Sequence, residues 1–78
     1  MTNLEKYNDV FLESLNVDKK DLEGLEYQKI PEWDSVGHMG LVAALEDAFE
    51  IMLDTDDIID LSSYKRGIEI LKKYKIQI

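Results

Sequence analysis

The most informative part of the chain is residues 33–49, which read Trp33-Asp34-Ser35-Val36-Gly37-His38-Met39-Gly40-Leu41-Val42-Ala43-Ala44-Leu45-Glu46-Asp47-Ala48-Phe49. Side chains at spacings of three and four lie on one face of a helix, and here that face carries His38, Leu41, Val42, Leu45 and Phe49. The opposite side carries Val36, Met39, Gly40, Ala43 and Asp47. Either Asp34 or Ser35 can cap the first turn. We therefore expect a helix with one buried face.

The residues before this stretch predict another helix and an irregular connection. Thr2 and Glu5 have the spacing of a capping box, in which each side chain binds a backbone amide of the other. An apolar stripe follows, made of Leu4, Tyr7, Phe11 and Leu15. Between residues 16 and 33, Asp18 and Asp21 can begin a short helical turn, which Gly24 interrupts.

The residues after the stretch predict two more helices. The acids of residues 54–57 can cap a short one that carries Ile58, Ile59 and Leu61. Ser62 or Ser63 can cap the last one, whose inward side chains are Ile68, Leu71 and Tyr64. No segment has the two-residue alternation of a strand. We expect a single all-α domain over residues 1–78, a small four-helix bundle of three longer helices and one short one.

The composition limits the kinds of function. The 78 residues include 17 Asp and Glu against nine Lys and Arg, for a net charge of −8, and 45% are apolar. That apolar fraction indicates a folded module, and the absence of Cys excludes disulfides and thiolate metal sites. No segment has the length of a membrane span. We expect a cytoplasmic monomer that binds neither nucleic acid nor membranes and prefers partners with basic faces.

The negative charge is concentrated in one segment. Residues 30–60 contain nine carboxylates and no Lys or Arg, and these acids are Glu32, Asp34, Glu46, Asp47, Glu50, Asp54, Asp56, Asp57 and Asp60. Val36 and Met39 lie within this segment, on the side of their helix that faces away from the predicted core. They either cover the neighbouring loop of Trp33 or form an exposed apolar patch with an acidic rim, which is typical of a protein docking site.

Three catalytic or metal-binding interpretations are weaker. Ser35 and His38 are three residues apart, but a serine hydrolase also needs an orienting acid, an oxyanion hole and a cleft, so a histidine at the core edge is the better interpretation. One histidine without cysteines makes no zinc site. The acidic run from Asp54 has Ile59 where a calcium loop requires glycine. Gly37 and Gly40 match no phosphate loop; they either admit a close neighbour or have no role.

Residues 33–49 resemble the acyl carrier proteins and the related peptidyl carriers. The shared pattern is Asp34-Ser35 followed by an apolar residue, then a helix with Leu41-Val42 that ends in Leu45-Glu46-acid-x-Phe49. The resemblance continues through Asp56, Asp57, Ile58 and Leu61. Val36 and the uncharged first two turns differ from the fatty-acid carriers. The sequence Trp33-Asp34-Ser35-x-x-His38-Met39 looks more like that of freestanding carriers of specialised pathways, such as polyketide, nonribosomal peptide or surface-polysaccharide assembly.

The resemblance implies a site and a cofactor. A phosphopantetheinyl transferase that uses magnesium would attach 4′-phosphopantetheine from coenzyme A to Ser35. The thiol of this arm would hold acyl or aminoacyl groups as thioesters for loading and transfer enzymes with basic docking faces. The docking residues would be Asp34, Val36, Met39, Glu46, Asp47 and Asp56. Such a carrier is not an enzyme and has no metal site of its own. The alternative is an unmodified module of the same fold that acts as an enzyme subunit or regulator.

Overall fold

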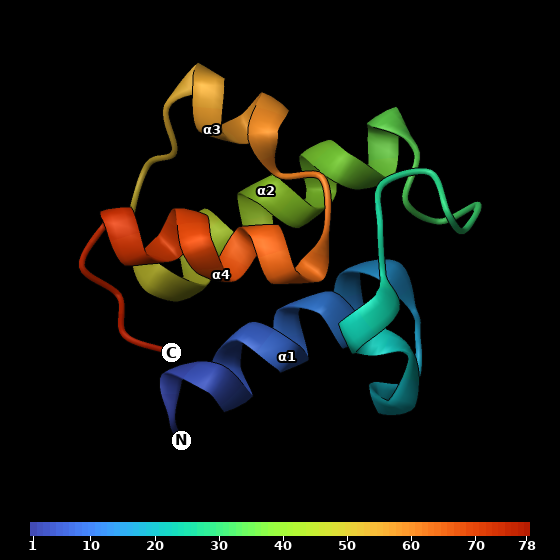
Figure 1. The fold of residues 1–78 in the computed structure, drawn as a ribbon, viewed down its shortest axis with the longest axis horizontal. Coiled ribbons are helices and arrows are strands. Elements are labelled where there is room, and N and C mark those ends of the chain that lie inside the picture. The colour runs from blue at the N-terminus through green and yellow to red at the C-terminus, as the bar shows by residue number, and fades with distance from the viewer.

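The computed structural model describes residues 1–78 and contains four α-helices and one 3-10 helix (Figure 1). The α-helices are α1 (Asn3–Leu15), α2 (Ser35–Phe49), α3 (Thr55–Asp60) and α4 (Tyr64–Lys73). The 3-10 helix η1 (Lys19–Gly24) lies between α1 and α2, where the sequence predicts only a short helical turn. The all-α fold with three longer helices and one short one is confirmed.

Three helices begin next to a residue whose side chain caps the first turn. Thr2 and Glu5 form the expected capping box at the start of α1. Asp34, not Ser35, caps α2: its carboxylate accepts from the Gly37 amide at 2.7 Å. Ser63 caps α4 in the same way. Because these caps satisfy amides that have no partner inside the helix, they fix the residues at which α1, α2 and α4 begin. Asp54 is the N-cap residue of α3, but its side chain makes no capping hydrogen bond.

The core contains 15 buried apolar residues. They are Tyr7, Val10, Phe11, Leu15, Leu22, Leu25, Trp33, Leu41, Val42, Leu45, Leu53, Leu61, Tyr64, Ile70 and Leu71. Leu4 is 42% exposed, so its assignment to the buried stripe of α1 is wrong, and Val10 takes part instead. No residue of α3 belongs to this core, although Leu53 and Leu61 on either side of α3 do. The apolar contact of α3 with this core is made by Ile58, which is half-buried and packs against it.

Two short segments pair and bring the loop before α2 next to the start of α4. The Tyr27 amide donates to the Ser62 carbonyl at 2.9 Å, and the Tyr64 amide donates to the Leu25 carbonyl at 3.0 Å. They form one isolated antiparallel bridge and no sheet. This pairing places Tyr27 and Ser62 on the same side of the molecule.

The two ends of the chain lie near each other, on the side of the molecule where α2 ends (Figure 1). The Asn3 side-chain amide donates to the Gln77 carbonyl at 3.0 Å, and the Lys6 ammonium lies 5.4 Å from the centre of the Phe49 ring. None of the helices combines the length and the apolar character that crossing a membrane requires.

Candidate functional site

Ser35 is the first residue of α2 and is exposed to solvent. Its position follows from the Asp34 cap, which fixes the start of the helix one residue earlier. The amides of a first helical turn point outward, and together with the helix dipole they favour a negative group nearby. A phosphate ester at Ser35 would therefore lie in a favourable electrostatic position.

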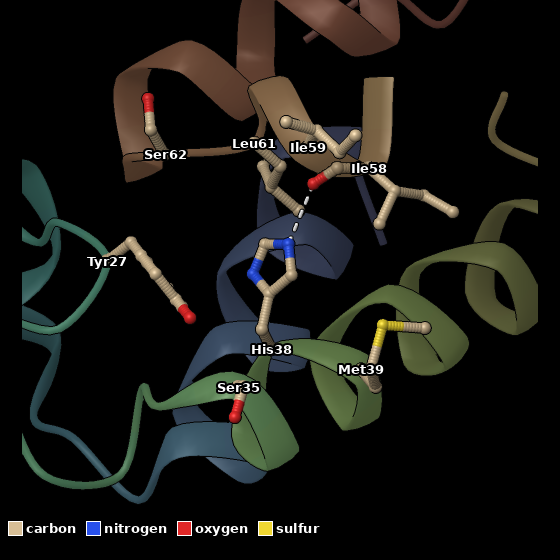
Figure 2. A pocket seen from close by; sticks show the side chains of 8 residues that line it. All are labelled: Tyr27, Ser35, His38, Met39, Ile58, Ile59, Leu61 and Ser62. Carbon is tan, nitrogen blue, oxygen red and sulfur yellow. Dashed lines mark hydrogen bonds between the residues drawn. The ribbon is translucent and has the colours of Figure 1, made fainter. Parts of the chain in front are cut away.

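A cavity of about 370 Å³ opens beside Ser35 (Figure 2). Three parts of the chain line it: the loop before α2, the first turns of α2, and α3 with the residues that follow it. The lining residues are Tyr27, Ser35, His38, Met39, Ile58, Ile59, Leu61 and Ser62. Five of the eight are apolar or aromatic, and Ser35, His38 and Ser62 are the polar ones, so the cavity suits a largely apolar group held close to Ser35.

His38 lies between α2 and α3, and both of its ring nitrogens have partners. The Trp33 indole N–H donates to Nδ1 at 2.9 Å, and Nε2 lies 2.7 Å from the Ile58 carbonyl oxygen, as the dashed line in Figure 2 shows. Since an indole N–H only donates and a carbonyl only accepts, the proton of the neutral ring must be on Nε2. The core-edge interpretation of this histidine is confirmed. Neither nitrogen is free to take a proton from Ser35.

The other side of α3 is attached to α4 through Asp57. This carboxylate is 5% exposed, pairs with the Lys73 ammonium, and accepts from the Tyr74 hydroxyl at 2.6 Å. We call these three residues the Asp57 cluster. The hydrogen bonds from Lys73 and Tyr74 lower the pKa of Asp57, and the same contacts raise the pKa values of Lys73 and Tyr74. The Asp54 amide also donates to the Tyr74 hydroxyl, at 2.9 Å.

The predicted docking residues differ in their exposure. Val36 and Met39 are 80% and 53% exposed, so they do not cover the loop of Trp33. The Trp33 side chain itself is fully buried in the core. Asp34, Asp47 and Asp56 are exposed as well. Glu46 is half-buried, and its carboxylate accepts from the Leu53 amide at 2.8 Å, which fixes the turn after α2.

The fold uses four of the nine carboxylates between residues 30 and 60, and the first of them, Asp34, caps α2. Glu46 binds the Leu53 amide, Asp57 belongs to its cluster, and Asp60 pairs with Arg66. The exposed acids that have no ion pair are Glu32, Asp34, Asp47, Glu50, Asp54 and Asp56. A segment with this many unpaired carboxylates attracts cationic side chains of a partner.

The sequence did not identify the cavity or most of its lining. Tyr27 and Ser62 come together only through the pairing of their segments, and no motif marks either one. The one sequence signal for the cavity is Ile59, an aliphatic residue in an acidic segment. In the structure its side chain is 75% exposed. No protein-family model and no curated protein matches this chain.

Proposed function

We propose that this chain is an acyl carrier protein, in which Ser35 carries 4′-phosphopantetheine donated by coenzyme A. The observation that best supports this proposal is the position of Ser35. It is the exposed first residue of α2 and lies next to a cavity of about 370 Å³. A phosphopantetheinyl transferase with magnesium would form the phosphodiester on Ser35, and the nucleotide part of coenzyme A would leave. The thiol of the arm then holds an acyl or aminoacyl group as a thioester.

The chemistry of the chain supports a carrier that imports its reactive group. The sequence contains no cysteine, so a thiol must come with the cofactor. The first-turn amides of α2 favour the phosphodiester charge. The carrier itself is not an enzyme in this proposal, because the nitrogens of His38 are both engaged and leave Ser35 without a base.

The surface around Ser35 supports recognition by partner enzymes. Val36 and Met39 offer exposed apolar contacts directly beside the attachment site. Asp34, Asp47 and Asp56 add exposed carboxylates. Glu46 of α2 accepts a hydrogen bond from the Leu53 amide through one carboxylate oxygen and adds a half-buried negative charge. Loading and transfer enzymes would present aliphatic side chains surrounded by Arg and Lys.

The first turns of α2 favour a specialised role over fatty-acid synthesis. No carboxylate lies between Ser35 and Leu45, so a partner that reads acids early in this helix finds none. We propose a freestanding, cytoplasmic, monomeric carrier in polyketide, nonribosomal peptide or surface-polysaccharide assembly.

The test is the intact mass of the protein after incubation with coenzyme A, magnesium and a broad-specificity phosphopantetheinyl transferase. We expect the wild type to gain one phosphopantetheine and Ser35→Ala to gain none. The exposed Ser62, which lines the same cavity, supplies the matched control: Ser62→Ala should be modified as the wild type is. If folded wild-type protein gains no mass, the alternative of an unmodified interaction module replaces the proposal.

A further inference from the structure

The attachment of α3 to the rest of the molecule combines polar contacts with the packing of one half-buried apolar side chain, Ile58. The helix has six residues and contributes none of them to the buried apolar core. Leu53 and Leu61 hold the chain on either side of it, while Ile58 and Ile59 line the cavity beside Ser35. A short helix with little apolar burial is the kind of element that opens locally at low free-energy cost.

Two sets of side chains hold α3 in place, one on each side. The Asp57 cluster and the Asp60–Arg66 ion pair connect it to α4. On the cavity side, the bond between His38 Nε2 and the Ile58 carbonyl is the one hydrogen bond that joins α2 to α3. The same imidazole accepts from Trp33 in the core, so a single ring connects the core, α2 and α3. We call the two hydrogen bonds of this ring the His38 bridge.

The His38 bridge requires a neutral imidazole, since Nδ1 must keep its lone pair to accept from the Trp33 indole N–H. We propose that the His38 bridge is a proton-sensitive connection that holds α3 over the cavity beside Ser35, and that α3 is released when the ring gains its second proton. A proton on Nδ1 would place two donors face to face, Nδ1–H and the indole N–H, and the ring would have to move away. Imidazoles take up this proton at mildly acidic pH.

The charged groups near the His38 ring are engaged with other partners or make no ion pair. Protonation of the ring therefore affects mainly the two hydrogen bonds of the His38 bridge. Tyr27 packs against the ring from the loop before α2, with ring centres 5.2 Å apart. On α3, Asp57 faces Lys73 and Tyr74, and Asp60 faces Arg66. On α2, Asp34 accepts from the Gly37 amide. Asp56 is exposed on α3 and makes no ion pair, and no carboxylate forms an ion pair with the His38 ring.

Release of α3 would change the surroundings of Ser35. Ile58 and Ile59 form the wall that α3 contributes to the cavity, and His38 of α2 faces this wall (Figure 2). When the Ile58 carbonyl loses its partner, this wall is free to move away from α2. The inference concerns the unmodified chain and does not depend on attachment of any group to Ser35.

The protein reports on the bridge directly, because it contains one histidine and one tryptophan. In NMR spectra of the unmodified chain, the single imidazole Cε1–H resonance follows protonation of His38 and the single indole N–H resonance follows the bond from Trp33. Amide exchange, corrected for the intrinsic effect of pH, measures the opening of α3 at Ile58, with Phe11 in α1 as the internal reference.

We expect three changes to occur together as the pH is lowered from about 8 to about 5, the range in which imidazoles change charge. The His38 resonance shifts, the Trp33 indole N–H resonance shifts, and protection of the Ile58 amide falls roughly fivefold, as expected for one lost hydrogen bond, while Phe11 stays protected. An indole N–H resonance that stays constant while His38 titrates would overturn the proposal. Equal loss of protection at Phe11 and Ile58 would overturn it too, because that pattern is global unfolding.

Two variants separate this bridge from other attachments of α3. His38→Gln keeps a donor and an acceptor but takes no proton in this range, so protection of Ile58 should no longer depend on pH between 5 and 8. Asp57→Asn is the matched control, since it weakens the α4 side of the same helix. It should lower the protection of Ile58 at every pH and keep the dependence on pH. A pH dependence that survives in His38→Gln rules the proposal out.

Discussion

The hydroxyl of Tyr7 occupies the space that a side chain at position 67 would need. A Cβ built on Gly67 would lie 2.1 Å from Tyr7 Oη, and this hydroxyl donates to the Tyr64 carbonyl at 2.6 Å. The two contacts show that the Tyr7 side chain of α1 reaches the backbone of the first turn of α4. Burial raises the pKa of the Tyr7 hydroxyl far above its ordinary value, so it stays protonated and remains a donor over the whole working range of pH.

Gly67→Ala should therefore destabilise the protein, although alanine is the better helix former. Overpacking of this kind costs about 1–3 kcal/mol, which exceeds the roughly 1 kcal/mol that alanine gains over glycine inside a helix. Urea unfolding of Gly67→Ala, Tyr7→Phe and the double variant measures the coupling. Because Tyr7→Phe removes the nearest clashing atom, the double variant should be about 1 kcal/mol more stable than the sum of the single changes. Strict additivity would contradict this account.

Gly37 and Gly40 should respond oppositely to alanine. A Cβ at Gly37 would lie 1.9 Å from the Glu32 carbonyl oxygen, whereas a Cβ at Gly40 would meet nothing within 4 Å. We expect Gly37→Ala to lower the free energy of unfolding by about 1–3 kcal/mol and Gly40→Ala to raise it by about 0.5–1 kcal/mol. Thermal unfolding of the two variants side by side provides the check, and equal effects would contradict it.

Asp34 has a structural role that can be separated from its proposed role in docking. Asp34→Ala removes the acceptor of the Gly37 amide and should cost about 1 kcal/mol. Asp34→Asn keeps an acceptor and loses only the charge, so stability should stay within about 0.5 kcal/mol. Under the carrier proposal, both variants should be modified by a phosphopantetheinyl transferase several-fold more slowly. If Asp34→Asn is modified at the wild-type rate, the charge of Asp34 takes no part in docking of the transferase.

Val36 should matter for partners and not for folding. Its side chain is 80% exposed, so Val36→Ser should change the free energy of unfolding by no more than about 0.5 kcal/mol. The rate of phosphopantetheine attachment should fall, since an apolar contact beside Ser35 is lost. Ala43→Ser, exposed on the same helix two turns later, is the control and should leave the rate unchanged.

Asp57 should account for part of the acid denaturation. Hydrogen bonds from Lys73 and Tyr74 lower its pKa below the ordinary value of 3.8, so the stabilisation is complete above that pH and is lost as the pH falls through the folded-state pKa. Asp57→Asn should therefore be less stable than the wild type by a constant amount between about pH 5 and 8, and the gap should narrow below about pH 3.8. Urea unfolding along a pH series measures this, and a gap that widens in acid would contradict it.

The sequence predicted the features that depend on neighbours along the chain. The capping box of Thr2 and Glu5 and the buried face of Leu41, Val42 and Leu45 follow from spacings of three and four residues, and the structure contains both. Leu4 was assigned wrongly, because helical spacing does not show where a buried stripe begins.

The features that depend on distant neighbours could not be predicted. His38 binds the backbone of a residue 20 positions later, and a backbone carbonyl has no sequence signature. Asp57 stands among exposed acids with nothing in its local pattern to mark burial against Lys73. Gly37 and Gly40 look alike in sequence, yet only Gly37 is required for a close approach, by the Glu32 carbonyl.

The contact between Asn3 and Gln77 has a practical consequence for engineering. Since the two ends of the chain lie together, a short glycine-rich linker would join them into a continuous backbone ring. Such a ring has fewer unfolded conformations, and the folded state should melt at a higher temperature for that reason. The join lies beside the end of α2, while Ser35 is at its start, so a ring or a fusion at this point leaves the serine open to large enzymes.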